Sequence, residues 1–110
     1  MPMLGAILTP HPPVLLSEVG RGKELEIDAT GRAMRAAAEE VARWEPDVLI
    51  VSSPHTILYG DYFHISPGSS GVGSMAAFGA PKVRIEAQYD AQLRDEIVRR
   101  AQTAGLEAGT

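Results

Sequence analysis

The sequence predicts an α/β fold, a three-layer strand–helix–strand domain built on a mostly parallel central sheet. Two apolar, strand-like runs occupy residues 4–8 and 47–51, and each leads into a proline-flanked histidine. One amphipathic helix is predicted between them. A strand–helix–strand unit of this length joins two parallel strands through a right-handed crossover. The length of 110 residues fits a single domain over residues 1–110.

The first predicted strand, residues 4–8, is almost continuously apolar. Such a run is typical of a strand that is covered on both faces, as in a parallel sheet. Pro10, Pro12 and Pro13 end it, and Pro12 also restricts His11 to an extended backbone. Residues 20–23 are then expected to form a loop.

The first predicted helix begins near Asp28 or Thr30, either of which can cap it, and ends near Glu45. Its apolar residues recur every three or four positions and define one face: Met34, Ala37, Val41 and Trp44. Pro46 stops the helix, because proline cannot continue it. The second predicted strand, residues 47–51, follows directly.

The second half of the chain predicts two more strands and one more helix. Within residues 59–66, residues 62–65 have strand composition. Residues 68–79 are expected to form a long flexible loop, and residues 82–85 alternate as a strand with one solvent-exposed face. Asp90 can cap a helix that ends at Gly105, with its inward positions expected at Leu93, Ile97, Ala101 and Ala104. No return strand is expected after it, so the chain is interpreted as a fold that is incomplete at its C-terminal end.

Composition narrows the class of protein. The chain is 45% hydrophobic and 22% charged, which is ordinary for a soluble globular protein. Its net charge is −4 with scattered basic residues, which argues against nucleic acid or an anionic membrane as partner. It has no cysteine, so any metal must be held by His, Asp, Glu or water. With no signal peptide and no apolar run of roughly 20 residues, a cytoplasmic location is expected.

The two proline-flanked histidines are the strongest candidates for function. His11 and His55 each follow a predicted strand, and parallel strands put their carboxyl ends at one edge of the sheet, where ligands bind. The pattern therefore predicts a shared metal or catalytic site. His64 lies inside a predicted strand and is expected to be structural or at the surface. The candidates for a third, carboxylate ligand are Glu18, Asp61 and Glu86, each of which is also an ordinary surface carboxylate.

Two other motifs carry little weight. The glycine-rich run at residues 68–74 lacks the Gly-Lys-Ser/Thr ending of a phosphate loop and does not lead from a strand into a helix. Ser52 and Ser53 lack the Gly-x-Ser-x-Gly elbow of a serine hydrolase. The glycine-rich run is better interpreted as a mobile loop near the histidine edge.

At these residues the chain resembles the N-terminal part of class III extradiol ring-cleavage dioxygenases. The likeness is carried by the motifs at residues 9–13, Val19-Gly20, Thr30, Pro46-Asp47, residues 53–55 and residues 78–81. More narrowly the chain is similar to the LigB-like group of this class, which includes Memo-like proteins and the LigB-type domain of the AmmeMemoRadiSam system. The resemblance implies a non-haem ferrous site with His11 and His55 as metal ligands.

The family's glutamate ligand and its acid/base histidine lie in a later segment and have no counterpart among these 110 residues, so the catalytic residues stay unknown. The resemblance implies a dioxygenase that opens a catechol-like aromatic diol with dioxygen, using Fe(II). A Memo-like metal-binding or partner-binding module without that activity is the alternative, and a zinc-dependent hydrolase is a weaker one. A homo-oligomer or a pairing with a second, different chain is expected as the assembly.

Overall fold

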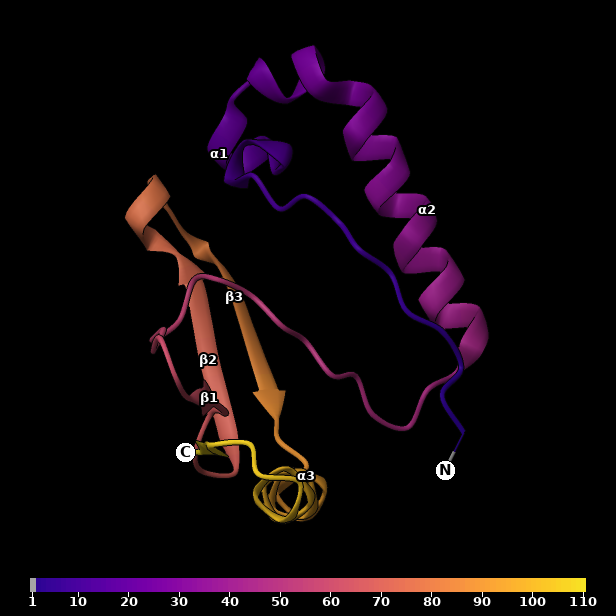
Figure 1. Cartoon of the computed structure of the whole chain (residues 1–110). Helices are drawn as coiled ribbons and strands as arrows, with labels where there is room; N and C mark the ends of the chain where they lie inside the picture. Colours follow the sequence, from indigo (N-terminus) through magenta and orange to yellow (C-terminus); the bar gives the residue numbers. More distant parts are fainter. Residues whose placement is uncertain (1) are drawn as a thin grey trace. The chain divides into compact units, whose positions relative to one another are not determined.

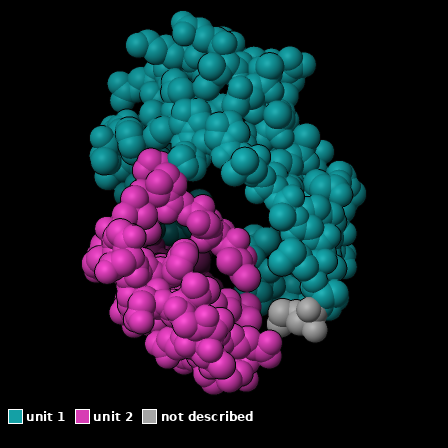
Figure 2. All heavy atoms as spheres, viewed as in Figure 1, with its two compact units in different colours: residues 1–49, 73–85 teal, residues 50–72, 86–110 magenta. Residues whose placement is uncertain are grey.

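The computed structural model describes residues 2–110 and combines helices with short strands (Figure 1). The chain divides into two compact units, coloured separately in Figure 2. Unit 1 comprises residues 1–49 and 73–85, and unit 2 comprises residues 50–72 and 86–110. The helices and the parallel pairing of two short strands confirm the predicted α/β class. The three-layer arrangement stays a prediction. Among the described residues, no helix is long and apolar enough to cross a membrane.

The long helix of unit 1 confirms the predicted one. Helix α2 runs over Asp28–Trp44, and Glu45 leaves it in a left-handed conformation with φ 46° just before Pro46. The expected cap at Asp28 or Thr30 was wrong, because Ile27 is the N-cap residue and no side chain caps the helix. The four residues of the predicted apolar face are all half-buried. On the opposite side, Arg32 and Asp28 form an exposed ion pair of 3.0 Å one turn apart. The helix is therefore held by one packed face, as amphipathic helices are.

Short helical turns precede α2 in unit 1. They are the 3₁₀ turn η1 over Pro13–Leu15, helix α1 over Ser17–Gly20, and the 3₁₀ turn η2 over Lys23–Ile27. The expected loop at residues 20–23 is the sharp turn between α1 and η2, where Arg21 and Gly22 both have positive φ. Residues 2–12 have no regular secondary structure and run beside α2, where Gly5 lies against the Trp44 ring (Figure 1).

The two strands predicted at residues 4–8 and 47–51 do not form, and this expectation was wrong. Both segments lack strand structure, and their side chains are open to solvent, with Leu8 100% and Val51 83% exposed. A β-strand needs a neighbour to satisfy its backbone N–H and C=O groups. Neither run has such a neighbour within residues 2–110.

A hairpin replaces the flexible loop expected at residues 68–79. Strand β2 covers Ser70–Met75, the 3₁₀ turn η3 covers Ala76–Phe78, and β3 covers Ala80–Gln88. The two strands form one sheet, and β3 confirms and extends the strand expected at residues 82–85. The expected alternation of burial fails, because Val83 is half-buried while Ile85 is 70% exposed. Gly71 in β2 lies against the Tyr89 hydroxyl, so a Cβ at this position would collide with that hydroxyl.

Unit 2 is organised by the helix α3, Ala91–Thr103, whose predicted ends are confirmed. The Leu93 amide donates to Asp90 Oδ1 at 2.9 Å, as expected of an N-cap. At the other end Gly105, with φ 80°, and Leu106 donate to the carbonyls of Gln102 and Ala101. These two bonds form a Schellman motif. Of the inward positions, Ala104 is exposed because it lies in this cap, and the other three are half-buried.

A short strand does follow α3, which corrects the expectation that the return strand is missing. Strand β4, Ala108–Gly109, pairs in parallel with β1, Phe63–His64, in the register Phe63–Ala108 and His64–Gly109. The Phe63 and Ile65 amides donate to Glu107 and Gly109 carbonyls, each at 2.8 Å. Gly109 is buried against the Tyr62 hydroxyl, so a side chain there would collide with it.

Only small side chains are deeply buried in this structure. Among the described residues the buried hydrophobic ones are Ala80, 6% exposed, and Ala108, 3% exposed. The core formed by residues 2–110 is therefore thin. Since apolar burial is the main favourable term in folding, each larger contact, such as that of Trp44, carries a large share of the stability.

Two glycines of unit 1 are expected to respond in opposite ways to alanine. A Cβ at Gly20 would lie 2.6 Å from the Val14 carbonyl oxygen, so Gly20→Ala should destabilise the protein by about 1–3 kcal/mol. At Gly31, inside α2, the nearest atoms lie at 3.8 Å, so Gly31→Ala should stabilise it by about 0.5–1 kcal/mol. Urea denaturation of both variants measures these changes, and a destabilised Gly31→Ala would contradict this packing.

Candidate metal ligands and an aromatic pocket

The two predicted metal ligands lie in different units. His11 belongs to unit 1, where it is exposed and precedes Pro12 and the η1 turn. His55 belongs to unit 2, is also exposed, and its backbone N–H donates to Ser53 Oγ at 3.2 Å. Both histidines are therefore exposed and lie beside proline, but neither follows a strand. Their convergence on one metal stays a prediction.

The three candidate carboxylate ligands are all exposed. Glu18 lies in α1 of unit 1 and accepts a long hydrogen bond of 3.4 Å from the Ser17 hydroxyl. Asp61 and Glu86 lie in unit 2, Asp61 just before β1 and Glu86 in β3. Within residues 2–110, no group of three or more His, Asp and Glu side chains is arranged to hold a metal. The two imidazoles suit Fe(II) or Zn(II) in kind, and a third ligand is still needed.

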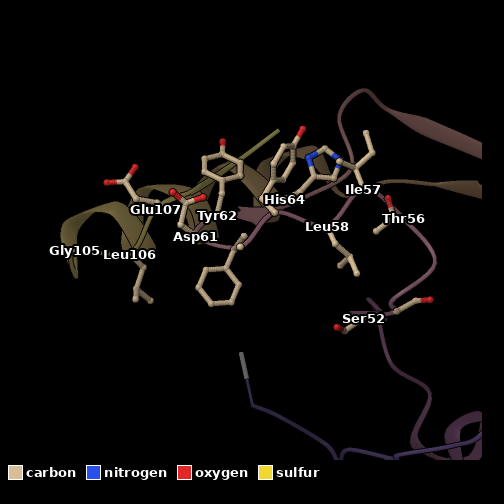
Figure 3. Close-up of a pocket in the computed structure, with 14 residues that line it drawn as sticks. Ser52, Thr56, Ile57, Leu58, Asp61, Tyr62, His64, Gly105, Leu106 and Glu107 are labelled. Atoms are coloured by element: carbon tan, nitrogen blue, oxygen red, sulfur yellow. The ribbon is translucent and has the colours of Figure 1, made fainter.

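Unit 2 contains a pocket of about 530 Å³. It lies between the chain on both sides of Pro54, strand β1 and the segment that follows α3 (Figure 3). Its wall is formed by residues from these three segments: Ser52, Ser53, residues 56–64 and residues 105–107. The β1–β4 pairing explains the third segment, because the bond from the Phe63 amide to the Glu107 carbonyl holds residues 105–107 beside β1.

Aromatic rings form one part of the pocket wall. Tyr59 and Tyr62 pack edge to face, with centroids 5.6 Å apart and planes at 83°. The His64 ring lies 6.1 Å from the Tyr59 ring at 66°. Tyr59 is 52% exposed and Phe63 is 65% exposed, and both residues line the pocket. Exposed apolar surface in a concave, hydroxyl-containing site is typical of binding sites for small organic molecules.

The charges around this pocket are negative. All arginines of unit 2 lie on α3, and each is already engaged by a carboxylate or carbonyl. Arg94 binds Asp95 at 2.9 Å and the Gly68 carbonyl at 2.6 Å. Arg99 and Arg100 donate hydrogen bonds to Glu96 and lower the pKa of that carboxyl from 4.5 to about 2. The pocket wall itself carries Asp61 and Glu107 and no basic residue other than His64.

His64 lies in β1, inside the strand that the sequence predicts. The residues that line the pocket beside it were not predicted. The half-buried ring of His64 contacts Tyr59, as a structural histidine would, and it also lines the pocket. The sequence signal for this wall was the aromatic run of residues 59–64 directly after the Pro-His corner. The contribution of residues 105–107 could not be foreseen, because the return strand β4 was not expected.

Comparison with known proteins agrees with the resemblance noted in the sequence. Residues 5–110 match the family described as the catalytic LigB subunit of aromatic ring-opening dioxygenase. The chain is also similar to Protein CA_C1420 of Clostridium acetobutylicum, with 34% identity over 97 residues. This alignment covers 88% of the chain and 21% of the relative, so the chain spans about a fifth of the relative's length. No solved structure matches the chain.

Proposed function

Because this chain belongs to the family of catalytic LigB subunits of aromatic ring-opening dioxygenases, we propose that it contributes to the extradiol cleavage of a catechol-like diol by dioxygen. The family match carries the proposal, since it covers residues 5–110 and so includes both proline-flanked histidines. The proposal places the protein in the cytoplasm. The chain corresponds to about a fifth of the length of its relative. Ring cleavage by a whole enzyme is therefore also a proposal.

His11 and His55 would hold the metal, with Fe(II) favoured and Zn(II) accepted by the same donors. Ferrous iron, when bound, supplies the redox chemistry between a diol and dioxygen. The chain would supply two neutral imidazole nitrogens, each fixed by what its second nitrogen binds. The Ser53 hydroxyl oxygen supports the corner at His55 by accepting a 3.2 Å hydrogen bond from the backbone N–H of His55. The third, carboxylate ligand would be Glu18, Asp61, Glu86 or, as the family resemblance implies, a glutamate outside these 110 residues.

The experiment that tests this proposal measures metal and activity together. The purified protein is loaded anaerobically with Fe(II), its iron content is determined, and oxygen uptake and ring-opened yellow product are followed with catechol. We expect about one iron per assembled site, and ring opening once the missing ligand is present. Failure to retain any iron or zinc would contradict the proposal.

A Memo-like metal-binding or partner-binding module is the second candidate. If this alternative holds, the loading experiment should give stoichiometric metal binding without oxygen uptake. Adding a second chain should not restore oxygen uptake. The weaker hydrolase alternative gives zinc in place of iron.

A further inference from the structure

The pocket of unit 2 adjoins the His55 corner. Ser53 and Thr56, which flank Pro54 and His55 in the chain, both contribute to its wall. A molecule in the pocket would therefore lie beside a proposed metal ligand of the same unit. The volume of about 530 Å³ is within the range of pockets that take small organic ligands.

The two carboxylates of the pocket are brought to the same end of it. The parallel register sets Phe63 opposite Ala108, so Glu107, directly before β4, and Asp61, two residues before β1, come from neighbouring segments. Figure 3 shows both side chains near Tyr62. Within residues 2–110, neither Asp61 nor Glu107 has an ion-pair partner, and the arginines of α3 are bound to other groups. This end of the pocket is therefore an uncompensated negative region.

We propose that this pocket holds the aromatic ring of the substrate and selects rings with a neutral or amine-bearing side chain over rings with a carboxylate. The identity of the ligand as a diol rests on the proposed function. Tyr59 and Tyr62 offer ring edges and faces for stacking, and a tyrosine face also attracts an ammonium group. Asp61 and Glu107 attract the same ammonium group and repel a carboxylate.

The test uses the metal-free 110-residue chain and three matched catechols that differ mainly in side-chain charge. They are 3,4-dihydroxyphenethylamine, 4-ethylcatechol and 3,4-dihydroxyphenylacetate, and their binding is measured by titration calorimetry at low ionic strength. We expect the amine to bind roughly three- to tenfold more tightly than the acid, with the neutral catechol between them, as partly exposed charge pairs allow. Added salt should narrow this ratio, because it screens the charges.

Variants assign the effect to the pocket. The double variant Asp61→Asn/Glu107→Gln should bring the amine-to-acid ratio close to one and leave the affinity for 4-ethylcatechol unchanged. Tyr59→Ala should weaken all three ligands, and circular dichroism checks that it is folded. Glu26→Gln, which removes a carboxylate from the η2 turn of unit 1, is the matched control and should leave the ratio as it is.

Three outcomes would overturn the inference. They are an acid that binds as tightly as the amine, a ratio that survives the double variant, and no binding of any catechol at millimolar concentration. The experiment is separate from the test of the proposed function, because it needs no metal. Iron retained without the charge preference would refute the pocket alone, and the charge preference without iron retention would refute the metal site alone.

Discussion

Replacing either His11 or His55 by alanine is expected to lower the Fe(II) affinity of this protein by more than about tenfold. Loss of even an outer partner of a metal ligand costs about 10–100-fold in affinity, and loss of a ligand itself costs at least as much. Both imidazoles are exposed, so neither substitution leaves a cavity, and the protein should stay folded. Iron content after anaerobic loading and desalting measures the effect directly.

The third histidine provides a matched control. His64 is predicted not to bind the metal, and its ring contacts Tyr59 in unit 2. His64→Ala should therefore keep the iron content of the unmodified protein. Full iron content in both His11→Ala and His55→Ala would refute the proposed ligands, and a loss confined to His64→Ala would transfer the site to the pocket.

Replacing Trp44 by alanine is expected to destabilise the protein by about 2–4 kcal/mol. Removal of a buried tryptophan costs about 3–5 kcal/mol, and Trp44 is only half-buried. Its ring lies against the backbone of Gly5, and its Nε1 donates to Glu40 Oε1 at 2.9 Å. The contact joins the N-terminal segment to α2, so its loss should also loosen that segment. Urea denaturation gives the change in free energy of unfolding.

The substitution Trp44→Phe separates ring packing from the hydrogen bond. Phenylalanine keeps most of the contact with Gly5 and loses the donor to Glu40, so a smaller destabilisation is expected. Arg43 is the larger cause of the lowered pKa of Glu40, and Trp44 is the second, so the Glu40 carboxylate keeps a partner in this variant. Equal stabilities for Trp44→Ala and Trp44→Phe would show that the ring contact contributes little.

The helices could be predicted from the sequence because their signals are local. The three- and four-residue spacing placed the packed face of α2, and Pro46 marked its end. Asp90 and Gly105 marked the two ends of α3, and both make the predicted cap interactions. The signals at Pro46, Asp90 and Gly105 act within one helical turn, so they depend little on distant parts of the chain.

The strands and the pocket could not be predicted in the same way. Apolar composition suggested strands at residues 4–8 and 47–51, but a strand depends on a partner that the local sequence does not specify. Glycine content suggested a loop at residues 68–79, where the pairing of β2 with β3 prevails. The pocket depends on the pairing of β1 with β4, which joins distant segments. The family could be predicted without any strand pairing, because it follows from motifs in the sequence. The expected convergence of His11 and His55 depended on two strands that do not form.

The β1–β4 pair has a consequence for the folding kinetics of unit 2. Its two amide bonds, from Phe63 and Ile65, connect the middle of the chain to its last residues. Such a contact closes a long loop, and the entropy of that closure opposes its early formation. Helix α3 shortens the loop once it has formed, so the pair should assemble after the helix, late on the folding path. Of the hydrogen-bonded backbone amides in unit 2, those of Phe63 and Ile65 should then be among the first to exchange their hydrogens with solvent.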